Sequence, residues 1–111
     1  MKRKPIFISL FMLSTLICFA QQQSLITGIV FTNDYLPAEG ANIVLLSATD
    51  SAFITGTAAN KNGNFQLKEI PKGLYYVQVS MLGYQKNSCK ANILAGKPFM
   101  LDTIYLQPEA I

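Results

Sequence analysis

Apolar side chains recur at every second position along most of this chain. Successive side chains of a β-strand point to opposite faces, so a period of two turns one row toward a core and the other toward water. No segment carries apolar residues at helical spacing over a length that would bury a helix. The pattern therefore predicts an all-β fold. It is clearest where Tyr75, Val77, Val79 and Met81 alternate with Tyr76, Gln78 and Ser80.

Clusters of Gly, Asn, Asp and Pro divide this pattern into seven short segments. Polar residues on one side of most segments favour a β-sandwich with two solvated outer faces over a small barrel. Residues 84–94 are more polar and are expected to form an edge strand. Asp102 and Thr103 interrupt the last segment and predict a bulge. The expected strands cover residues 25–32, 41–46, 53–59, 64–68, 75–81, 84–94 and 99–106.

Residues 1–20 have the layout of a secretory signal peptide. A basic start at residues 2–4 precedes an uncharged run, and cleavage is expected between Ala20 and Gln21. A membrane anchor is one alternative, but residues 6–20 are fewer than the roughly 20 that a spanning helix needs. Acylation of Cys18 in a lipoprotein is another, although the bulky residues before it disfavour that processing. The chain is therefore expected to be exported.

The charge of the chain changes once the expected signal peptide is removed. Six lysines and six acidic residues remain in residues 21–111, so the basic character of the whole chain arises from the targeting segment. A neutral chain of this kind is not expected to bind nucleic acid. Cys89 is then the one remaining cysteine, and no intrachain disulfide can form. We expect Cys89 to be buried in the sheet, because the chain has no histidine to activate its thiol.

The segment from Asn60 to Phe65, "NKNGNF", separates two apolar runs. Its asparagines offer amide oxygens but no carboxylate, which disfavours calcium. Gly63 leads into a strand rather than a helix, which disfavours a phosphate site. We therefore expect a hairpin turn in which Asn62 and Gly63 take positive φ values. In such a turn Gly63→Val should harm folding, whereas Asn60→Ala should cost little.

Nothing in the sequence supports catalysis. Without histidine neither a Ser-His-Asp nor a Cys-His set can form, and a single cysteine cannot build a zinc site. The acidic residues are scattered in or near turns and are expected to be surface charges. We therefore expect no enzyme, no catalytic or metal-binding residues and no cofactor. Tyr75 and Tyr84 are expected to be structural, and Tyr76 and Tyr35 are candidate surface aromatics for a sugar or a protein partner.

The order and spacing of the punctuating residues resemble the carboxypeptidase regulatory-like domain over residues 25–107. The resemblance implies a seven-stranded Greek-key-type β-sandwich of the prealbumin (transthyretin-like) type, which is also grouped with carbohydrate-binding-like folds. The family's turn commonly contains Thr-Asp where this chain has Ala59 and Asn60, so a charged ligand or a strong cap of that turn is not expected. The similar elements are Gly28-x-Val30, Gly40-Ala41-x-Ile43-x-Leu45, Asn60-x-x-Gly63-x-Phe65-x-Leu67, Ile70-Pro71-x-Gly73-x-Tyr75-x-Val77-x-Val79 and Leu82-Gly83-Tyr84.

In many Gram-negative bacteria a domain of this family follows the signal peptide of TonB-dependent receptors and related outer-membrane β-barrel proteins. The segment "LDTIYLQPEAI" is similar to the close of the domain, where such receptors continue into the plug. The resemblance implies a non-catalytic periplasmic accessory domain of an outer-membrane transport protein, with the plug, the barrel or a periplasmic protein as partner. The alternative is a freestanding secreted module that binds carbohydrate or protein. The expected division is a signal peptide at 1–20, a polar leader at 21–24, the domain at 25–107 and the start of a linker at 108–111.

Overall fold

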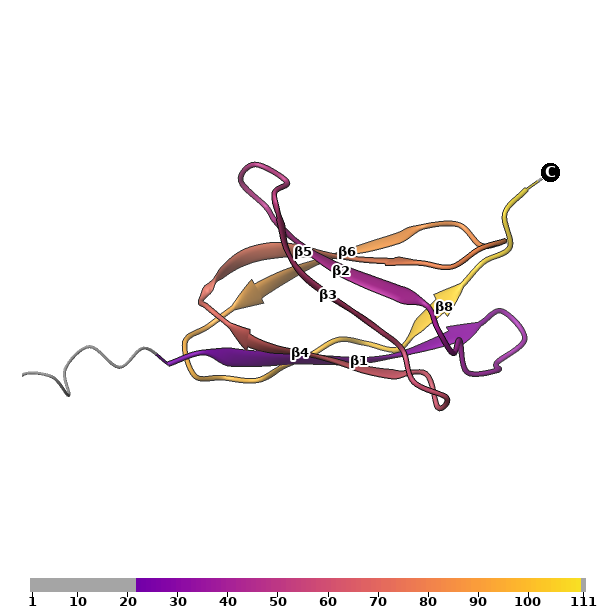
Figure 1. The fold of residues 1–111 in the computed structure, drawn as a ribbon, viewed down its shortest axis with the longest axis horizontal. Helices are drawn as coiled ribbons and strands as arrows, with labels where there is room; N and C mark the ends of the chain where they lie inside the picture. The colour runs from indigo at the N-terminus through magenta and orange to yellow at the C-terminus, as the bar shows by residue number, and fades with distance from the viewer. Residues whose placement is uncertain (1–21, 111) are drawn as a thin grey trace, which may run out of the picture.

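The computed structural model describes residues 22–110. The predicted signal peptide, with its cleavage site between Ala20 and Gln21, lies outside these residues. The described chain forms two layers of strands that face one another (Figure 1). None of residues 22–110 belongs to a helix long and apolar enough to cross a membrane. The strands are β1 (Ser24–Thr32), β2 (Asn42–Ser47), β3 (Phe53–Ala58), β4 (Asn64–Ile70), β5 (Gly73–Ser80), β6 (Asn87–Ile93), β7 (Phe99–Met100) and β8 (Ile104–Leu106).

Strand β1 lies at the centre of the first sheet. On one side it pairs with β4 in antiparallel orientation, and on the other side it pairs with β7 and then β8 in parallel orientation. The second sheet has the order β3-β2-β5-β6, and all its neighbours are antiparallel. The last two strands of the chain therefore complete the sheet that the first strand begins.

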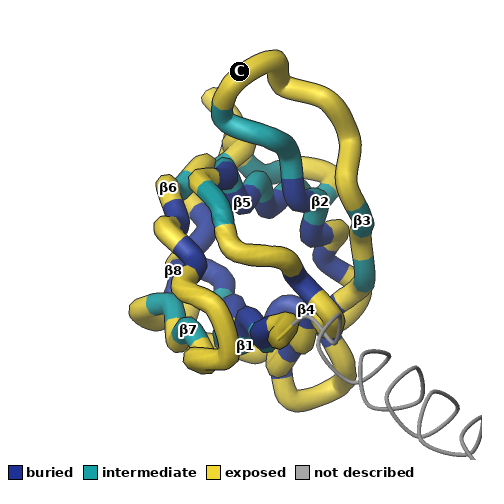
Figure 2. Tube along the Cα trace, turned by 90° about the vertical axis from the view of Figure 1, so that its left-hand side faces the viewer, coloured by how far each residue is buried: buried dark blue, intermediate teal, exposed yellow. Residues whose placement is uncertain are grey.

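The core lies between the two sheets and consists of the alternating side chains that the sequence pattern predicted. In the end-on view of Figure 2, buried positions alternate with exposed ones along the strands. Burial of each large aliphatic side chain contributes about 1.5–3 kcal/mol. Tyr75 is also buried, and its hydroxyl donates a hydrogen bond to the carbonyl oxygen of Pro71 at 2.8 Å. The largest fully buried side chains are Ile26, Ile43, Leu45, Leu67, Ile70, Ile93, Leu106, Val30, Val77 and Val79.

The predicted all-β sandwich is confirmed, and β6 forms an edge of the second sheet as expected. The last expected strand is in fact two short strands, so the described chain has eight strands rather than seven. Met100 is in register with Thr27, and Ile104 is in register with Val30, so the path between them contains one residue more than the matching stretch of β1. The extra residue interrupts the ladder around Asp102 and Thr103, where the sequence predicted a bulge.

The two ends of the domain are more closely bound to it than the sequence suggested. Ser24, expected in a polar leader, is buried at the start of β1, and its hydroxyl donates to the carbonyl oxygen of Lys97. Residues 108 and 109, expected in a linker, pair with the segment before β6, because Pro108 forms a bridge with Tyr84 and the amide of residue 109 donates to the carbonyl oxygen of residue 83. The amide of Gln85 also donates to the carbonyl oxygen of residue 107, and β6, which was expected from residue 84, begins at residue 87, where its pairing with β5 starts.

The "NKNG" turn differs from the expected hairpin. Strands β3 and β4 belong to different sheets, so the turn carries the chain from one layer to the other. Gly63 has a φ of 83°, but Asn62 does not have a positive φ. The amide of Gly63 donates to the carbonyl oxygen of Asn60 at 2.9 Å. The prediction of a primed turn is therefore wrong, because a connection between sheets need not match the twist of a two-stranded hairpin.

Asn60 caps this turn. Its side-chain Oδ1 accepts hydrogen bonds from the backbone amides of Asn62, at 2.9 Å, and Asn64, at 3.0 Å. An amide oxygen can therefore supply the two acceptor contacts of the turn without a carboxylate. The expectation that the turn lacks a strong cap, and that Asn60→Ala costs little, is revised accordingly.

Candidate functional site

The acidic and thiol groups of the described chain do not assemble into a reactive centre. Among residues 22–110, no three His, Cys, Asp or Glu side chains form a group that could hold a metal ion. Cys89 is half-buried on β6, where its Sγ donates to Oδ1 of Asn87 at 3.4 Å. Burial raises the pKa of the Cys89 thiol, and the negative charge of Asp102 raises it further. A thiol with a raised pKa stays protonated and is a poor nucleophile, as a structural role requires.

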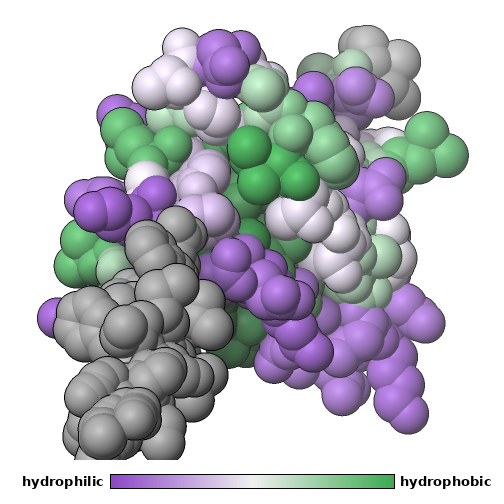
Figure 3. Space-filling model, turned by 60° about the vertical axis from the view of Figure 1, so that its left-hand side comes forward, coloured by the Kyte–Doolittle hydropathy of each residue, from purple (hydrophilic) through white to green (hydrophobic). Residues whose placement is uncertain are grey.

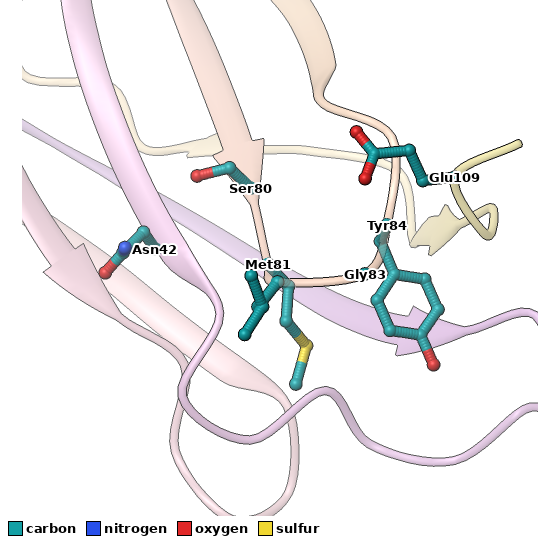
Figure 4. A pocket seen from close by; sticks show the side chains of 7 residues that line it. Asn42, Ser80, Met81, Gly83, Tyr84 and Glu109 are labelled. Carbon is teal, nitrogen blue, oxygen red and sulfur yellow. The ribbon is translucent and has the colours of Figure 1, made fainter. Parts of the chain in front are cut away.

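One hollow lies where the end of β5 meets the C-terminal segment (Figure 4). Its volume is about 270 Å³, and its lining includes Asn42 and Ser80 from the strands and Tyr84 and Glu109 from the loops. Figure 4 shows that the polar ends of Asn42, Tyr84 and Glu109 lie apart and do not converge on one point. This arrangement lacks the close pair of polar groups that acid–base or nucleophilic chemistry needs.

Tyr76 lies on the outer face of the second sheet, within a row of apolar side chains. We call this the apolar face, and it consists of Val44, Leu46, Phe53, Leu74 and Tyr76. Leu46 is in register with Phe53 of β3 on one side and with Tyr76 of β5 on the other. Phe53 is 66% exposed and Leu74 is 43% exposed, whereas the other three are half-buried.

The ring of Phe53, the most exposed member of the apolar face, lies beside Gly56. A Cβ atom at Gly56 would lie 3.6 Å from the ring of Phe53, so the ring lies beside the backbone of β3. Figure 3 shows exposed apolar side chains between hydrophilic ones on one face of the molecule. Contiguous exposed apolar side chains are a feature of interaction surfaces.

Tyr35 lies on the other sheet, in the loop that follows β1. Its ring centroid is 5.5 Å from that of Tyr105, and the two rings meet edge to face with an interplanar angle of 74°. Tyr105 in turn stacks on Phe31 at 6.0 Å between centroids. The structure therefore does not bring the two predicted surface tyrosines together. Tyr35 and Tyr76 belong to separate surfaces on opposite sides of the sandwich.

The sequence reasoning missed the aromatic partners of Tyr35. Tyr105 alternates with the buried Ile104 and Leu106, so its outward direction could have been read from the period of two. Its position beside Phe31 depends on the parallel pairing of β8 with β1, which no local pattern indicates. Asn33 and Gln107 lie next to the tyrosines and line an open hollow of about 340 Å³ with them. We call this four-residue site the aromatic hollow.

The fold of the described residues defines a small all-β sandwich domain. Residues 26–110 match the family described as the CarboxypepD_reg-like domain, and the chain belongs to that family. The resemblance seen in the sequence is thereby confirmed. The family is a non-catalytic, regulatory-like β-sandwich module. A search of curated proteins found no match to the sequence.

Several solved structures share the fold at low sequence identity. The major pilin subunit BcpA of Bacillus cereus has a TM-score of 0.66 and 15% identity, with 79% of this chain and 31% of that chain covered. A cohesin–X-dockerin complex of Acetivibrio cellulolyticus has a TM-score of 0.61 and 16% identity, with 77% of this chain and 58% of that chain covered. The 5-hydroxyisourate hydrolase of Klebsiella pneumoniae has a TM-score of 0.58 and 16% identity, with 79% of this chain and 90% of that chain covered.

These likenesses concern the fold alone. This chain spans a minority of the pilin chain and somewhat over half of the cohesin–X-dockerin chain. Pilins and a hydrolase share the sandwich, so the fold does not decide the activity.

Proposed function

We propose that this chain is an exported, non-catalytic interaction domain at the N-terminus of a TonB-dependent receptor-like outer-membrane protein, where it lies in the periplasm. The observation that carries the proposal is that the family match begins at residue 26, directly after a segment with the layout of a signal peptide. A domain in that order contributes a rigid surface to the transport protein rather than a chemical step. Its partner is the plug or barrel of the same receptor.

The apolar face is the surface that we assign to this partner. Phe53 is 66% exposed, and removal of its ring from water by a partner surface would be favourable. Strand β3 is also an edge of its sheet, so its outer backbone groups are free to pair with an added strand. An apolar strand of the plug could therefore pair with β3 and cover Phe53 at the same time.

The coding sequence beyond codon 111 tests the receptor context. We expect a reading frame for a plug and a β-barrel that is continuous with this one or directly next to it. Export is tested by the mass of the processed chain, which should begin at Gln21. If the frame encodes no plug or barrel, or if residues 1–20 remain on the chain, the proposal is wrong.

Site-specific photo-crosslinking in intact cells of the source organism tests the apolar face. A photoreactive residue in place of Phe53 is expected to form an adduct with the plug or barrel polypeptide. The matched control is the same substitution at Met100, which is 81% exposed on the opposite sheet. Adducts from position 100 alone, or none from position 53, would contradict the assignment of this face.

A freestanding secreted module that binds carbohydrate or protein is the second candidate. The aromatic hollow favours it, because two tyrosines and two amides line one open depression. Such a module would bind its target while separate from any barrel, so a secreted chain recovered free in the culture medium would support it. Recovery of the chain in the outer-membrane fraction alone would count against it.

A further inference from the structure

The loop that presents Tyr35 holds this residue in a backbone conformation that few side chains favour. Tyr35 has a φ of 64°, in the left-handed region where glycine and asparagine are the usual residues. The loop is closed by hydrogen bonds from the amide of Thr32 to the carbonyl oxygen of Leu36, at 2.8 Å, and from the amide of Tyr35 to that of Thr32, at 3.0 Å. Backbone strain of this kind is concentrated at functional sites.

Burial does not compensate for this strain. The Tyr35 side chain is 74% exposed, so little apolar area leaves water when the loop forms. Its ring touches Tyr105 edge to face, and an edge-to-face contact with such high exposure leaves a ring face open to solvent. Tyr35 therefore contributes little to the stability of the fold, but its ring is held at a defined position with one face exposed.

Tyr105 provides a firm base for this arrangement. It belongs to β8, where it is in register with Phe31 of β1, and the two rings stack at 6.0 Å. The neighbours of Tyr105 on both sides, Ile104 and Leu106, are buried in the core. The hollow between Tyr35 and Tyr105 is therefore attached to two strands rather than to a loop alone.

The groups that line the hollow indicate the chemistry of its ligand. Besides the two tyrosines, Asn33 and Gln107 complete the lining, and neither carries a charge. An amide side chain offers both donors and an acceptor, which suits hydroxyl groups that donate and accept in turn. Without a lysine or arginine the lining does not favour phosphate, and without a carboxylate it does not favour a cation.

We propose that the aromatic hollow binds a neutral sugar ring of a glycan. One face of the ring would lie on Tyr35, and the ring hydroxyls would exchange hydrogen bonds with Asn33 and Gln107. This proposal goes beyond the receptor context, because the hollow lies on the opposite sheet from the apolar face. It rests on the second candidate function for its site and names the ligand class of that site. If no sugar binds, the receptor context is unaffected, whereas the second candidate loses its carbohydrate-binding form.

The test uses the full chain and Tyr35→Gly, which removes the ring and also relieves the strained φ. Binding of short neutral oligosaccharides of glucose, xylose, mannose and galactose is measured by calorimetry and by amide chemical shifts. An acidic oligosaccharide and a proline-rich peptide are the comparison ligands. We expect at least one neutral sugar to bind and to shift the amides of Asn33, Tyr35 and Gln107.

Tyr35→Gly should weaken that binding about tenfold or more and leave the melting temperature unchanged or higher. The matched control Tyr76→Ala, on the other sheet, should leave the affinity unchanged. The proposal is overturned if no neutral sugar binds, if Tyr35→Gly binds as well as the original chain, or if only the peptide or the acidic sugar binds. A loss of affinity in Tyr76→Ala alone would overturn it too, since it would place the sugar on the apolar face.

Discussion

The backbone of Val30 holds Gly63 from two directions. The amide of Val30 donates a hydrogen bond to the carbonyl oxygen of Gly63 at 2.8 Å. The carbonyl oxygen of Val30 lies where a Cβ atom on Gly63 would have to be placed. The inter-sheet turn thus contacts the central strand through a position that only glycine can occupy.

Gly63→Ala is expected to destabilise the domain by about 3 kcal/mol. The cost combines the left-handed φ of 83° with the steric overlap against Val30. Gly40→Ala is the matched control, because Gly40 has a φ of 84° but would meet nothing within 4 Å. The control should lose only about 1 kcal/mol. Urea denaturation measures both variants, and equal losses would show that space at position 63 does not matter.

Asn60→Ala is expected to lower the free energy of unfolding by about 1–2 kcal/mol, because two backbone amides of the turn lose their shared acceptor. Asn60→Asp keeps the acceptor and should remain close to the original stability. Asn62→Ala removes an exposed side chain from the same turn and serves as the control. Thermal unfolding in the presence of a chelator separates this effect from any ion. A negligible effect of Asn60→Ala would remove the capping role.

Tyr75→Phe tests the buried hydroxyl. The variant keeps the ring in the core but leaves the carbonyl oxygen of Pro71 without its partner, at an expected cost of about 1 kcal/mol. Tyr76→Phe, one position along the same strand, removes a hydroxyl from the outer face and should cost less. Chemical denaturation of the two variants side by side gives the comparison. The hydroxyl of Tyr75 is dispensable if both lose the same amount.

Cys89 is expected to react more slowly in the folded chain than in urea. Its pKa is raised by burial and then by Asp102, so a smaller fraction is thiolate at mildly alkaline pH. The pKa of the thiol is higher in the folded chain than in the unfolded chain. The contribution of the protonated thiol to stability is therefore fully present below the unfolded pKa, and it is lost as pH rises through the folded pKa. Stability should therefore fall on the alkaline side of the ordinary thiol pKa, and the fall should be smaller in Cys89→Ala.

Iodoacetamide labelling measures the reactivity of Cys89, with Cys18 replaced by serine in every sample so that one thiol remains. Asp102→Asn removes the nearby negative charge and should speed labelling of the folded chain. The interpretation fails if folded and unfolded chains are labelled at the same rate.

The elements of the fold were predictable from the sequence, but their partners were not. The period of two located most of the strands, because side chains such as Val77 and Val79 must be buried on one face, but it did not separate β7 from β8. The assignment of β3 and β4 to different sheets was missed, since adjacent strands in sequence were assumed to form a hairpin. The capping role of Asn60 is local, because its Oδ1 accepts from amides two and four residues further on, so the preference of Asn for turns could have indicated it.

The candidate site was predictable only in part. The sequence identified Tyr35 and Tyr76 as surface aromatics, but not which of them has aromatic neighbours. Tyr105 reaches Tyr35 through a parallel pairing between the first and last strands, and such long-range pairing leaves no local pattern. The positive φ of Tyr35 likewise arises from the loop geometry and has no signature in residue type.

The parallel pairing of β1 with β7 and β8 sets the order in which the molecule can be completed. The contact between Ser24 and Lys97 joins residues 73 positions apart in the chain. A ribosome releases the N-terminal strand first, so β1 must wait with one edge unpaired until the C-terminal strands have been synthesised. Long-range pairing of this kind also slows folding. Until then the first sheet lacks the strands that cover one edge of β1, although β4 and all four strands of the second sheet are already available to pair.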